Sequence, residues 1–375
     1  MAPRYPLIST DDHVQEPPEL WSARLSKSRF GDRIPRLERT PEGTERWVVD
    51  GQVLLGGHAA RAGALMRDRN TEPARWDDVP PAAYQPLERL KLMDAAGVEY
   101  SVLFPTVAGM AGEAFGRLED HELELACVQA YNDWLIEEWA GASDRFIPQC
   151  IVPIWPAEST VAEIRRAVAM GHRGVVFPAV PMDLRDVPHV AGPEYDAVWA
   201  VCEELDVPLC FHAGSSPQLQ YPGAPELSPV LAEALDAVTK PVSSVFVLSM
   251  VLFSRLLLRH PKLRIVFAES ALSWGMLYLE WADHQFEHDG LAREGYELTP
   301  SEMFHRQCYL NAWFDEVAPF AQYVGTDRIV WSTNLPLATS TWPQTQATIE
   351  HCFRGVSEED TKRVLWENAA SLYRL

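Results

Sequence analysis

The sequence lacks three features that would each point to a particular kind of protein: paired cysteine spacings, an excess of positive charge, and a long uninterrupted hydrophobic run. Its six cysteines show no spacing typical of a metal motif or a disulfide framework. Three of them, Cys150, Cys210 and Cys308, lie inside apolar, strand-like runs. We therefore expect buried free thiols, as in proteins of a reducing cytoplasm.

The charge and hydropathy of the chain exclude further classes of protein. Asp and Glu number 53 against 32 Lys and Arg, which gives a net charge of -21 and argues against nucleic acid and anionic membranes as partners. The strongest apolar stretch, Val245–Leu258, is interrupted by Ser249, Ser254 and Arg255 and is too short to span a bilayer. No apolar signal segment precedes the first predicted strand. We expect a cytoplasmic protein.

Eight short apolar runs alternate with segments of helical pattern along the 375 residues. Parallel strands that are covered on both faces have this appearance. The runs are Leu7–His13, Glu99–Pro105, Phe146–Ile154, Gly174–Ala179, Val207–Ala213, Ile265–Glu269, Gln307–Trp313 and Arg328–Thr333. Eight such alternations predict an α/β fold, the (β/α)8 TIM barrel, rather than an open sheet.

Residues 20–83 depart from this alternation. Thr44–Leu55 has the pattern of a hairpin, and Gly56-Gly57 and an Arg-rich stretch follow it. We expect a single domain over residues 1–375, with a small lobe inserted after strand one, in a loop that helps to build the active-site face of such a barrel. A long helical segment, Ser228–Arg259, opens with a good capping residue, and Pro241 should divide it.

Polar residues occupy four of the predicted strand ends, where barrel enzymes place their chemistry. Asp11 and His13 lie at the end of strand one, and the alternation of side chains directs both to one face. Together they offer two ligands for a divalent cation. His212 closes strand five, Glu269 closes strand six, and Asn334 follows strand eight. Each has an ordinary alternative, such as a loop-capping histidine, a carboxylate at a helix N-terminus or a turn asparagine. Their convergence favours one shared site.

Several segments together resemble the amidohydrolase superfamily, in the amidohydrolase-related branch that also contains non-oxidative decarboxylases. They are Ile8–Pro17, Met93–Val98, Leu103–Thr106, Tyr131–Trp134, His172–Val175, Phe211–Gly214 and Ser340–Pro343. The resemblance covers nearly the whole chain. It implies one divalent metal, with zinc foremost, held by the first-strand pair, the strand-five histidine and a strand-eight aspartate that also handles protons.

The chain departs from that pattern at several positions. Asn334 stands where the family has the aspartate, and Leu337 stands where relatives often have histidine. At strand six, many decarboxylases carry histidine where this chain has Glu269. Strand four ends in Phe177-Pro178 and offers no lysine for a second metal.

These departures change the expected chemistry. Asn334 can offer a cation only its carbonyl oxygen, and it cannot act as a general base. The metal is therefore expected to be held by Asp11, His13, His212 and, weakly, Asn334, or to be absent. Glu269 is the first candidate to move protons. Asp12 is the second, although strand alternation points it away from the site.

Three functions remain open. The first is a metal-assisted lyase of the decarboxylase kind, or a hydrolase, acting on a small, partly aromatic organic acid or carbonyl compound. The second is a metal-independent lyase, cyclase or isomerase that uses Glu269 and His212 as an acid–base pair and Asn334 as a hydrogen-bond donor. The third is a non-catalytic binding protein. Tryptophans near strand ends (Trp21, Trp274, Trp313 and Trp342) suggest an aromatic pocket wall, and the resemblance suggests a homodimer formed through outer helices.

Overall fold

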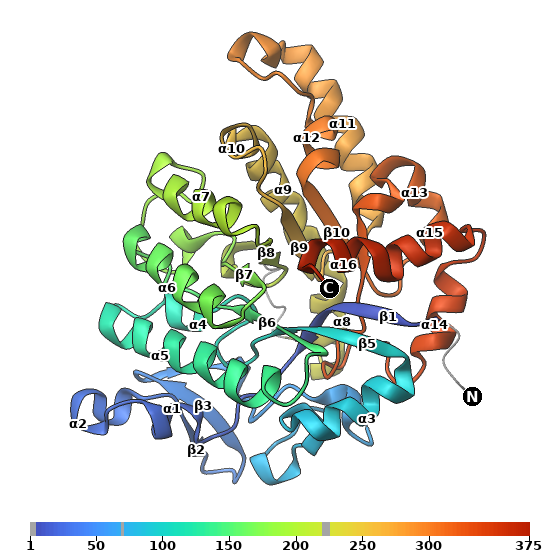
Figure 1. Ribbon diagram of the computed structural model, residues 1–375. Coiled ribbons are helices and arrows are strands. Elements are labelled where there is room, and N and C mark those ends of the chain that lie inside the picture. The colour runs from blue at the N-terminus through green and yellow to red at the C-terminus, as the bar shows by residue number, and fades with distance from the viewer. Residues whose placement is uncertain (1–4, 69–70, 220–225) are drawn as a thin grey trace.

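Eight parallel strands form the centre of the molecule, as Figure 1 shows. The computed structural model describes residues 5–68, 71–219 and 226–375; residues 1–4, where we predicted no signal segment, lie outside this part. The strands follow one another around the sheet in chain order: β1 (Leu7–His13), β5 (Val98–Phe104), β6 (Phe146–Cys150), β7 (Gly174–Val176), β8 (Leu209–His212), β9 (Ile265–Ala268), β10 (Cys308–Ala312) and β11 (Ile329–Trp331). The prediction of a (β/α)8 barrel is confirmed, and each predicted apolar run contains a strand or most of one.

The ring is closed by the residues that follow β11, which lie against β1. The Asn334 backbone N–H donates to the Asp11 carbonyl at 3.0 Å, and the His13 N–H donates to the Leu335 carbonyl at 2.7 Å. Farther into the barrel, the Thr10 hydroxyl donates to the Trp331 carbonyl at 2.9 Å. The two ends of the sheet are therefore joined by the same short segments that carry the predicted site residues.

Helices surround the strands, and most lie where the sequence predicted them (Figure 1). They are α3 (Pro86–Ala96), α4 (Glu113–Gly116), α5 (His121–Trp134), α6 (Ala157–Met170), α7 (Asp196–Leu205), α8 (Pro229–Thr239), α9 (Ser243–Phe253), α10 (Leu256–Arg259), α11 (Ser273–Asp289), α12 (Pro300–Gln307), α13 (Ala318–Val324), α14 (Thr345–Cys352), α15 (Glu358–Lys362) and α16 (Asn368–Tyr373). Short π-helical segments extend α5 through Leu135–Ala140 and join α15 to α16 through Arg363–Glu367.

Local sequence explains where several helices begin and end. Gly97 ends α3 in the left-handed conformation, with φ 79°, which a residue without a Cβ adopts at little cost. The Ser228 side chain accepts a hydrogen bond from the Leu231 N–H and caps α8, and Pro241 lies in the turn that separates α8 from α9, as predicted. Helix α12 was not predicted. Its signal was a capping box, in which Thr299 and Glu302 cap each other's backbone around Pro300.

Between β1 and α3 the chain forms a small lobe. It contains α1 (Leu20–Arg24), α2 (Lys27–Phe30) and an antiparallel sheet of β2 (Arg36–Arg39), β3 (Glu45–Val49) and β4 (Gln52–Val53). The predicted hairpin is the β3–β4 pair. Trp21 joins the lobe to the barrel helices, because its ring packs edge-on against Trp47 and Phe115 and its indole N–H donates to the Cys127 carbonyl. Trp21 is therefore a core residue and not part of a pocket wall.

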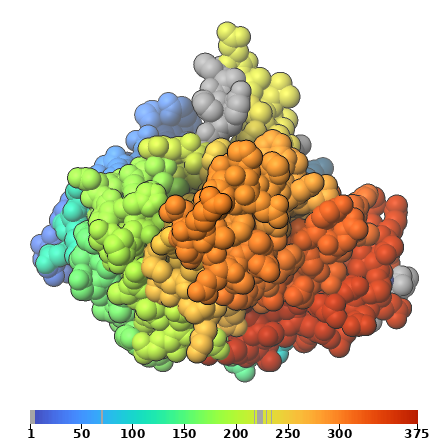
Figure 2. Space-filling view, turned by 90° about the horizontal axis from the view of Figure 1, so that it is seen from above, coloured from blue at the N-terminus to red at the C-terminus, as the bar shows by residue number. Residues whose placement is uncertain are grey.

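The buried core includes all six cysteines, which are free thiols as expected. The continuous helical stretch Val230–Phe253 is long and apolar enough to cross a membrane by length and composition, although Val245–Leu258 alone had seemed too short. The N-terminal half of that stretch is α8, which stands out from the body of the molecule (yellow in Figure 2). About one third of the stretch's most apolar window is buried, 33%. Its buried residues on α9, such as Leu248 and Leu252, have no exposed surface and pack in the core.

Asp12 ties three parts of the barrel together. Its carboxylate accepts hydrogen bonds from the Ser101 hydroxyl on β5, at 2.6 Å, and from the Thr333 hydroxyl and the Leu335 N–H after β11, at 2.5 and 2.9 Å. All of these groups are buried. Removing the carboxylate would leave several buried donors without an acceptor, which costs free energy.

Asp12→Ala is therefore expected to lower the free energy of unfolding by about 2–4 kcal/mol. The measurement is the shift of the urea midpoint, followed by circular dichroism and by tryptophan fluorescence. Asp94→Ala is the control, because Asp94 forms an exposed ion pair with Arg145, with 66% of its side chain accessible, and such pairs contribute about 0–1 kcal/mol. Equal midpoints for the two variants would contradict the joining role of Asp12.

Candidate metal and acid–base site

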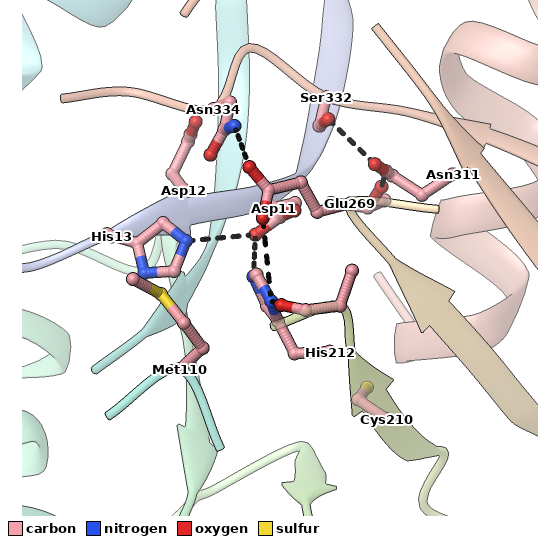
Figure 3. Close-up of polar contacts among 12 residues, drawn as sticks. Asp11, Asp12, His13, Met110, Cys210, His212, Glu269, Asn311, Ser332 and Asn334 are labelled. Carbon is pink, nitrogen blue, oxygen red and sulfur yellow. Dashed lines mark hydrogen bonds and ion pairs between the residues drawn. The ribbon is translucent and has the colours of Figure 1, made fainter. Parts of the chain in front are cut away.

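Asp11, His13 and His212 meet at the mouth of the barrel, where β1 and β8 end (Figure 3). Asp11 Oδ1 lies 3.4 Å from His13 Nε2 and 3.3 Å from His212 Nε2, and the two imidazole centroids are 5.1 Å apart. All three side chains are buried. As the alternation of β1 requires, Asp11 and His13 project to one side and Asp12 to the other.

Backbone carbonyls fix the tautomer and the orientation of both imidazoles. His13 Nδ1 lies 2.8 Å from the Pro105 carbonyl, and His212 Nδ1 lies 2.7 Å from the Ala213 carbonyl. Because a carbonyl only accepts hydrogen bonds, each Nδ1 carries the hydrogen and each Nε2 of the neutral ring keeps a lone pair directed at Asp11. Histidines that bind metals are commonly oriented in this way, with the other ring nitrogen donating to a carbonyl.

The donor atoms of this group fit a divalent cation. Among the residues that the structure describes, Asp11 Oδ1 and Oδ2, His13 Nε2, His212 Nε2 and Asn334 Oδ1 are all buried and make no hydrogen bond. Ligand atoms of Asp11, His13 and His212 lie within 4.8 Å of one another. Buried polar atoms are rarely left unpaired in folded proteins. A single cation would satisfy the ligand atoms of Asp11, His13 and His212 together. Asn334 Oδ1 is a further buried oxygen without a hydrogen-bond partner.

The ionisation of the group agrees with such a site. Burial alone would raise the pKa of Asp11, but His212 and His13 beside it hold that pKa below its usual range. Burial alone would lower the pKa of His212, but Asp11 and Glu269 raise it to about 9. A bound cation would replace the proton of His212, so metal uptake should release protons.

Glu269 and Asn334 complete the site from the loops after β9 and β11. Both adopt left-handed backbone conformations, with φ 52° and 55°, which cost non-glycine residues about 1–3 kcal/mol each. Asn334 Nδ2 donates to Glu269 Oε1 at 3.1 Å and to Thr339 Oγ1 at 2.9 Å, and Asn334 Oδ1 is buried and makes no hydrogen bond. Glu269 Oε2 makes no hydrogen bond and lies 3.9 Å from His212 Nδ1.

The alternative acid–base residue from the sequence, Asp12, finds no support in the geometry. Asp12 is engaged by its three hydrogen-bond donors on the far side of β1, so it does not replace Glu269 as the acid–base candidate. Phe177 follows β7 as a buried core side chain, and one cluster of metal-type ligands is found in the described part of the chain. That a bound metal would be single stays a prediction.

Two neighbours of the site were missed from the sequence. The buried Glu16 carboxylate accepts the N–H groups of Thr106, Val107 and Ala108, and burial raises its pKa to about 7 despite these donors. It thereby holds the loop whose Pro105 carbonyl orients His13. Lys240 places its Nζ 3.8 Å from Glu269 Oε2. Its signal in the sequence was the single basic residue within the predominantly apolar stretch Val230–Phe253.

A barrel that carries metal-binding residue types and a carboxylate at the carboxyl ends of its strands has the arrangement of a metal-dependent α/β-barrel enzyme. The family model described as Amidohydrolase matches residues 44–375. The chain therefore belongs to the amidohydrolase family, as the sequence motifs suggested, and is an enzyme of that superfamily.

Individual proteins agree with this assignment. Gamma-resorcylate decarboxylase of Rhizobium sp. (strain MTP-10005) is 26% identical over 313 residues, 76% of this chain and 86% of the relative. A crystal structure of an amidohydrolase from Mycobacterium avium subsp. paratuberculosis superposes with a TM-score of 0.77 at 21% identity over 99% of each chain. A dihydroxybenzoic acid decarboxylase of Polaromonas sp., with bound manganese and the inhibitor 2-nitroresorcinol, has a TM-score of 0.62 at 17% identity, over 99% of this chain and 97% of the other.

Proposed function

We propose that this enzyme is a metal-assisted lyase that removes carbon dioxide from a small aromatic acid, of the hydroxybenzoate kind. The observation that carries the proposal is the set of buried, unpaired donor atoms of Asp11, His13, His212 and Asn334 beside the free carboxylate oxygen of Glu269. The names of the similar decarboxylases support the choice of reaction and substrate class.

One divalent cation, held by Asp11, His13, His212 and the Asn334 carbonyl oxygen, would supply a Lewis acid for a phenolate or carboxylate oxygen of the substrate. Zinc suits this mixed set of nitrogen and oxygen donors, and manganese, which the Polaromonas enzyme binds, suits its oxygens. Elemental analysis of protein purified without added metal distinguishes the two.

Glu269 is the group that moves the proton in this proposal. Its protonated carboxyl group gives a proton to the ring carbon that bears the carboxylate. The bond between that carbon and the carboxylate then breaks, its electron pair returns to the ring, and carbon dioxide leaves. Glu269 is left ionised and regains a proton from solvent. The Asn334 amide N–H holds Glu269 Oε1, which leaves Oε2 as the oxygen that exchanges the proton.

The direct test is the release of carbon dioxide from 2,6-dihydroxybenzoate and related hydroxybenzoates by metal-loaded enzyme. His13→Ala removes one imidazole ligand and should lower both the bound metal and the rate by about 100-fold or more, beyond the 10–100-fold typical of outer-shell changes. Glu269→Gln should keep the metal and lose turnover. His351→Ala, at an exposed histidine with 52% of its side chain accessible, is the control and should change neither. Absence of carbon dioxide from every acid with metal-replete native enzyme would refute the proposal.

A metal-independent lyase or isomerase is the second candidate, and one observation favours it. The Asp11 carboxylate and the His212 imidazole compensate each other's charge within 3.3 Å, so the site is electrostatically tolerable without a cation. Glu269 and His212 would then act as the acid–base pair, and the Asn334 amide would donate to an oxyanion.

Asn334→Asp separates these two candidates. A carboxylate at 334 adds a full ligand charge beside Asp11, so metal affinity should rise by about tenfold or more. The change also removes the amide N–H that holds Glu269 and places two carboxyl groups side by side. In a metal-assisted enzyme, turnover should persist at saturating metal. In a metal-independent one, turnover should fall as metal uptake rises. Titration of both proteins with zinc or manganese while following turnover makes the comparison, and equal affinities would mean that residue 334 does not face the cation.

We also propose a homodimer. Large apolar side chains are exposed at four-residue intervals along α8 and α9 (Val238, Val242 and Phe246) and on the neighbouring α11 (Leu277 and Trp281), with 71% of Val238 and 70% of Trp281 accessible. An exposed apolar patch of this kind is typical of a protein interface. Light scattering should give twice the chain mass for the native enzyme and the single chain mass for the double variant Phe246→Glu, Trp281→Glu. A native monomer would refute the dimer.

A further inference from the structure

Lys240 is an isolated positive charge in a negatively charged chain. It is the only lysine or arginine between Arg185 and Arg255, in a protein of net charge -21. It lies in the short turn Lys240–Val242 between α8 and α9, a segment otherwise dominated by apolar side chains. The position of this one cation therefore calls for an explanation.

The Lys240 ammonium reaches the site from the outside. Its Nζ lies 3.8 Å from Glu269 Oε2 on the inner side and 3.4 Å from Asp236 Oδ2 on the outer side. Only 20% of the Lys240 side chain is accessible, whereas Asp236 is half exposed. The Lys240 ammonium thus lies between the carboxylate of Glu269 and the half-exposed carboxylate of Asp236 on α8.

The loop after β8 leaves room for the lysine stem. A Cβ placed on Gly214 would lie only 3.3 Å from Lys240 Cδ and 3.5 Å from Cε, and Gly214 has φ 84°, a conformation that side chains disfavour. Gly214 is two residues beyond His212. The loop that carries the candidate metal ligand His212 therefore leaves the space through which the Lys240 side chain passes.

A cavity of about 680 Å³ adjoins this position. It lies between the inserted lobe and α8, and its lining includes His58 and Arg61 from the lobe and Asp236 from α8. Asp236, which lines the cavity, pairs with Lys240, and Lys240 in turn pairs with Glu269, so the ammonium links the cavity wall to the site. The two segments that bound the cavity, coloured blue and yellow, both rise above the barrel in Figure 2.

The contacts of Lys240 leave it incompletely paired. The separation of 3.8 Å from Glu269 Oε2 is beyond hydrogen-bonding distance, and that oxygen has no hydrogen-bond partner. A shielded lysine and a shielded carboxylate that do not hydrogen-bond are a poor stabilising pair. The same ammonium could donate strong, charge-assisted hydrogen bonds to an incoming anion.

We infer that Lys240 binds the carboxylate of the substrate, holding it beside Glu269 on the side of the site that faces the cavity. This inference rests on the proposed function, because it takes an aromatic acid as the substrate. Without substrate, Lys240 pairs with Asp236 and Glu269. When the acid enters, its carboxylate replaces them as the main partner of the ammonium.

The test compares two probes that differ only by a carboxylate, 2,6-dihydroxybenzoate and resorcinol, by calorimetric titration into metal-loaded enzyme. Lys240→Gln should weaken binding of the acid by about 10–100-fold, the range for a hydrogen bond to a charged group, and should leave resorcinol affinity and metal content unchanged. Lys240→Arg should restore part of the affinity for the acid. Lys262→Gln, at an exposed lysine outside the site, is the control and should change neither affinity.

Equal weakening of both probes by Lys240→Gln would show that the lysine only supports the fold of the α8–α9 turn, and unchanged binding of the acid would also overturn the inference. Carbon dioxide release by Lys240→Gln with an unaltered KM would refute the inference and leave the proposed function intact. If binding of the acid depends on Lys240 but the native enzyme releases no carbon dioxide, the inference stands and the proposed function fails. Failure of the native enzyme to bind the acid would overturn both.

Discussion

The closure of the barrel between β1 and the segment after β11 is the constraint on which the candidate site depends. The Asn334 backbone N–H donates to the Asp11 carbonyl, and the His13 backbone N–H donates to the Leu335 carbonyl. These bonds join the first and last parts of the sheet, and the side chains of Asp11, His13 and Asn334 are positioned by the same backbone. The left-handed conformation of Asn334 is maintained there, because the closing hydrogen bonds leave that backbone little freedom. The hydrogen bonds that close the ring therefore also position Asp11, His13 and Asn334.

Asn334 has two tasks that an aspartate could not combine. Its amide N–H groups bind Glu269 and Thr339, and its buried carbonyl oxygen makes no hydrogen bond. A carboxylate accepts hydrogen bonds but donates none when ionised. The neutral amide thus fixes the neighbouring Glu269 carboxylate without adding a charge beside Asp11. Under the proposed function, the acid–base work then falls to Glu269 after strand six and not to the residue after strand eight.

The sequence predicted those features that depend on residues close together in the chain. The eight strands were visible as apolar runs, and the shared direction of Asp11 and His13 followed from alternation along one strand. The turn at Pro241 and the cap at Ser228 were equally local. Features set by distant packing were missed. Glu16 is significant only because the loop at 106–108 folds onto it, Trp21 turned out to be core, and Lys240 acquires its place from Gly214 and Glu269, which are far from it in the sequence.

The two imidazoles take their orientation from main-chain carbonyls, at Pro105 and Ala213. A carbonyl is present whatever side chain its residue carries, so no single substitution can delete either of these acceptors. The direction of both Nε2 lone pairs therefore does not depend on the side chains of residues 105 and 213. Substitutions at residues 334, 269 and 240 leave these two main-chain acceptors in place. The groups that we propose to handle protons and bind anions could therefore change during evolution while the imidazoles that would hold a cation keep their acceptors, and new reactions could arise on this barrel in that way.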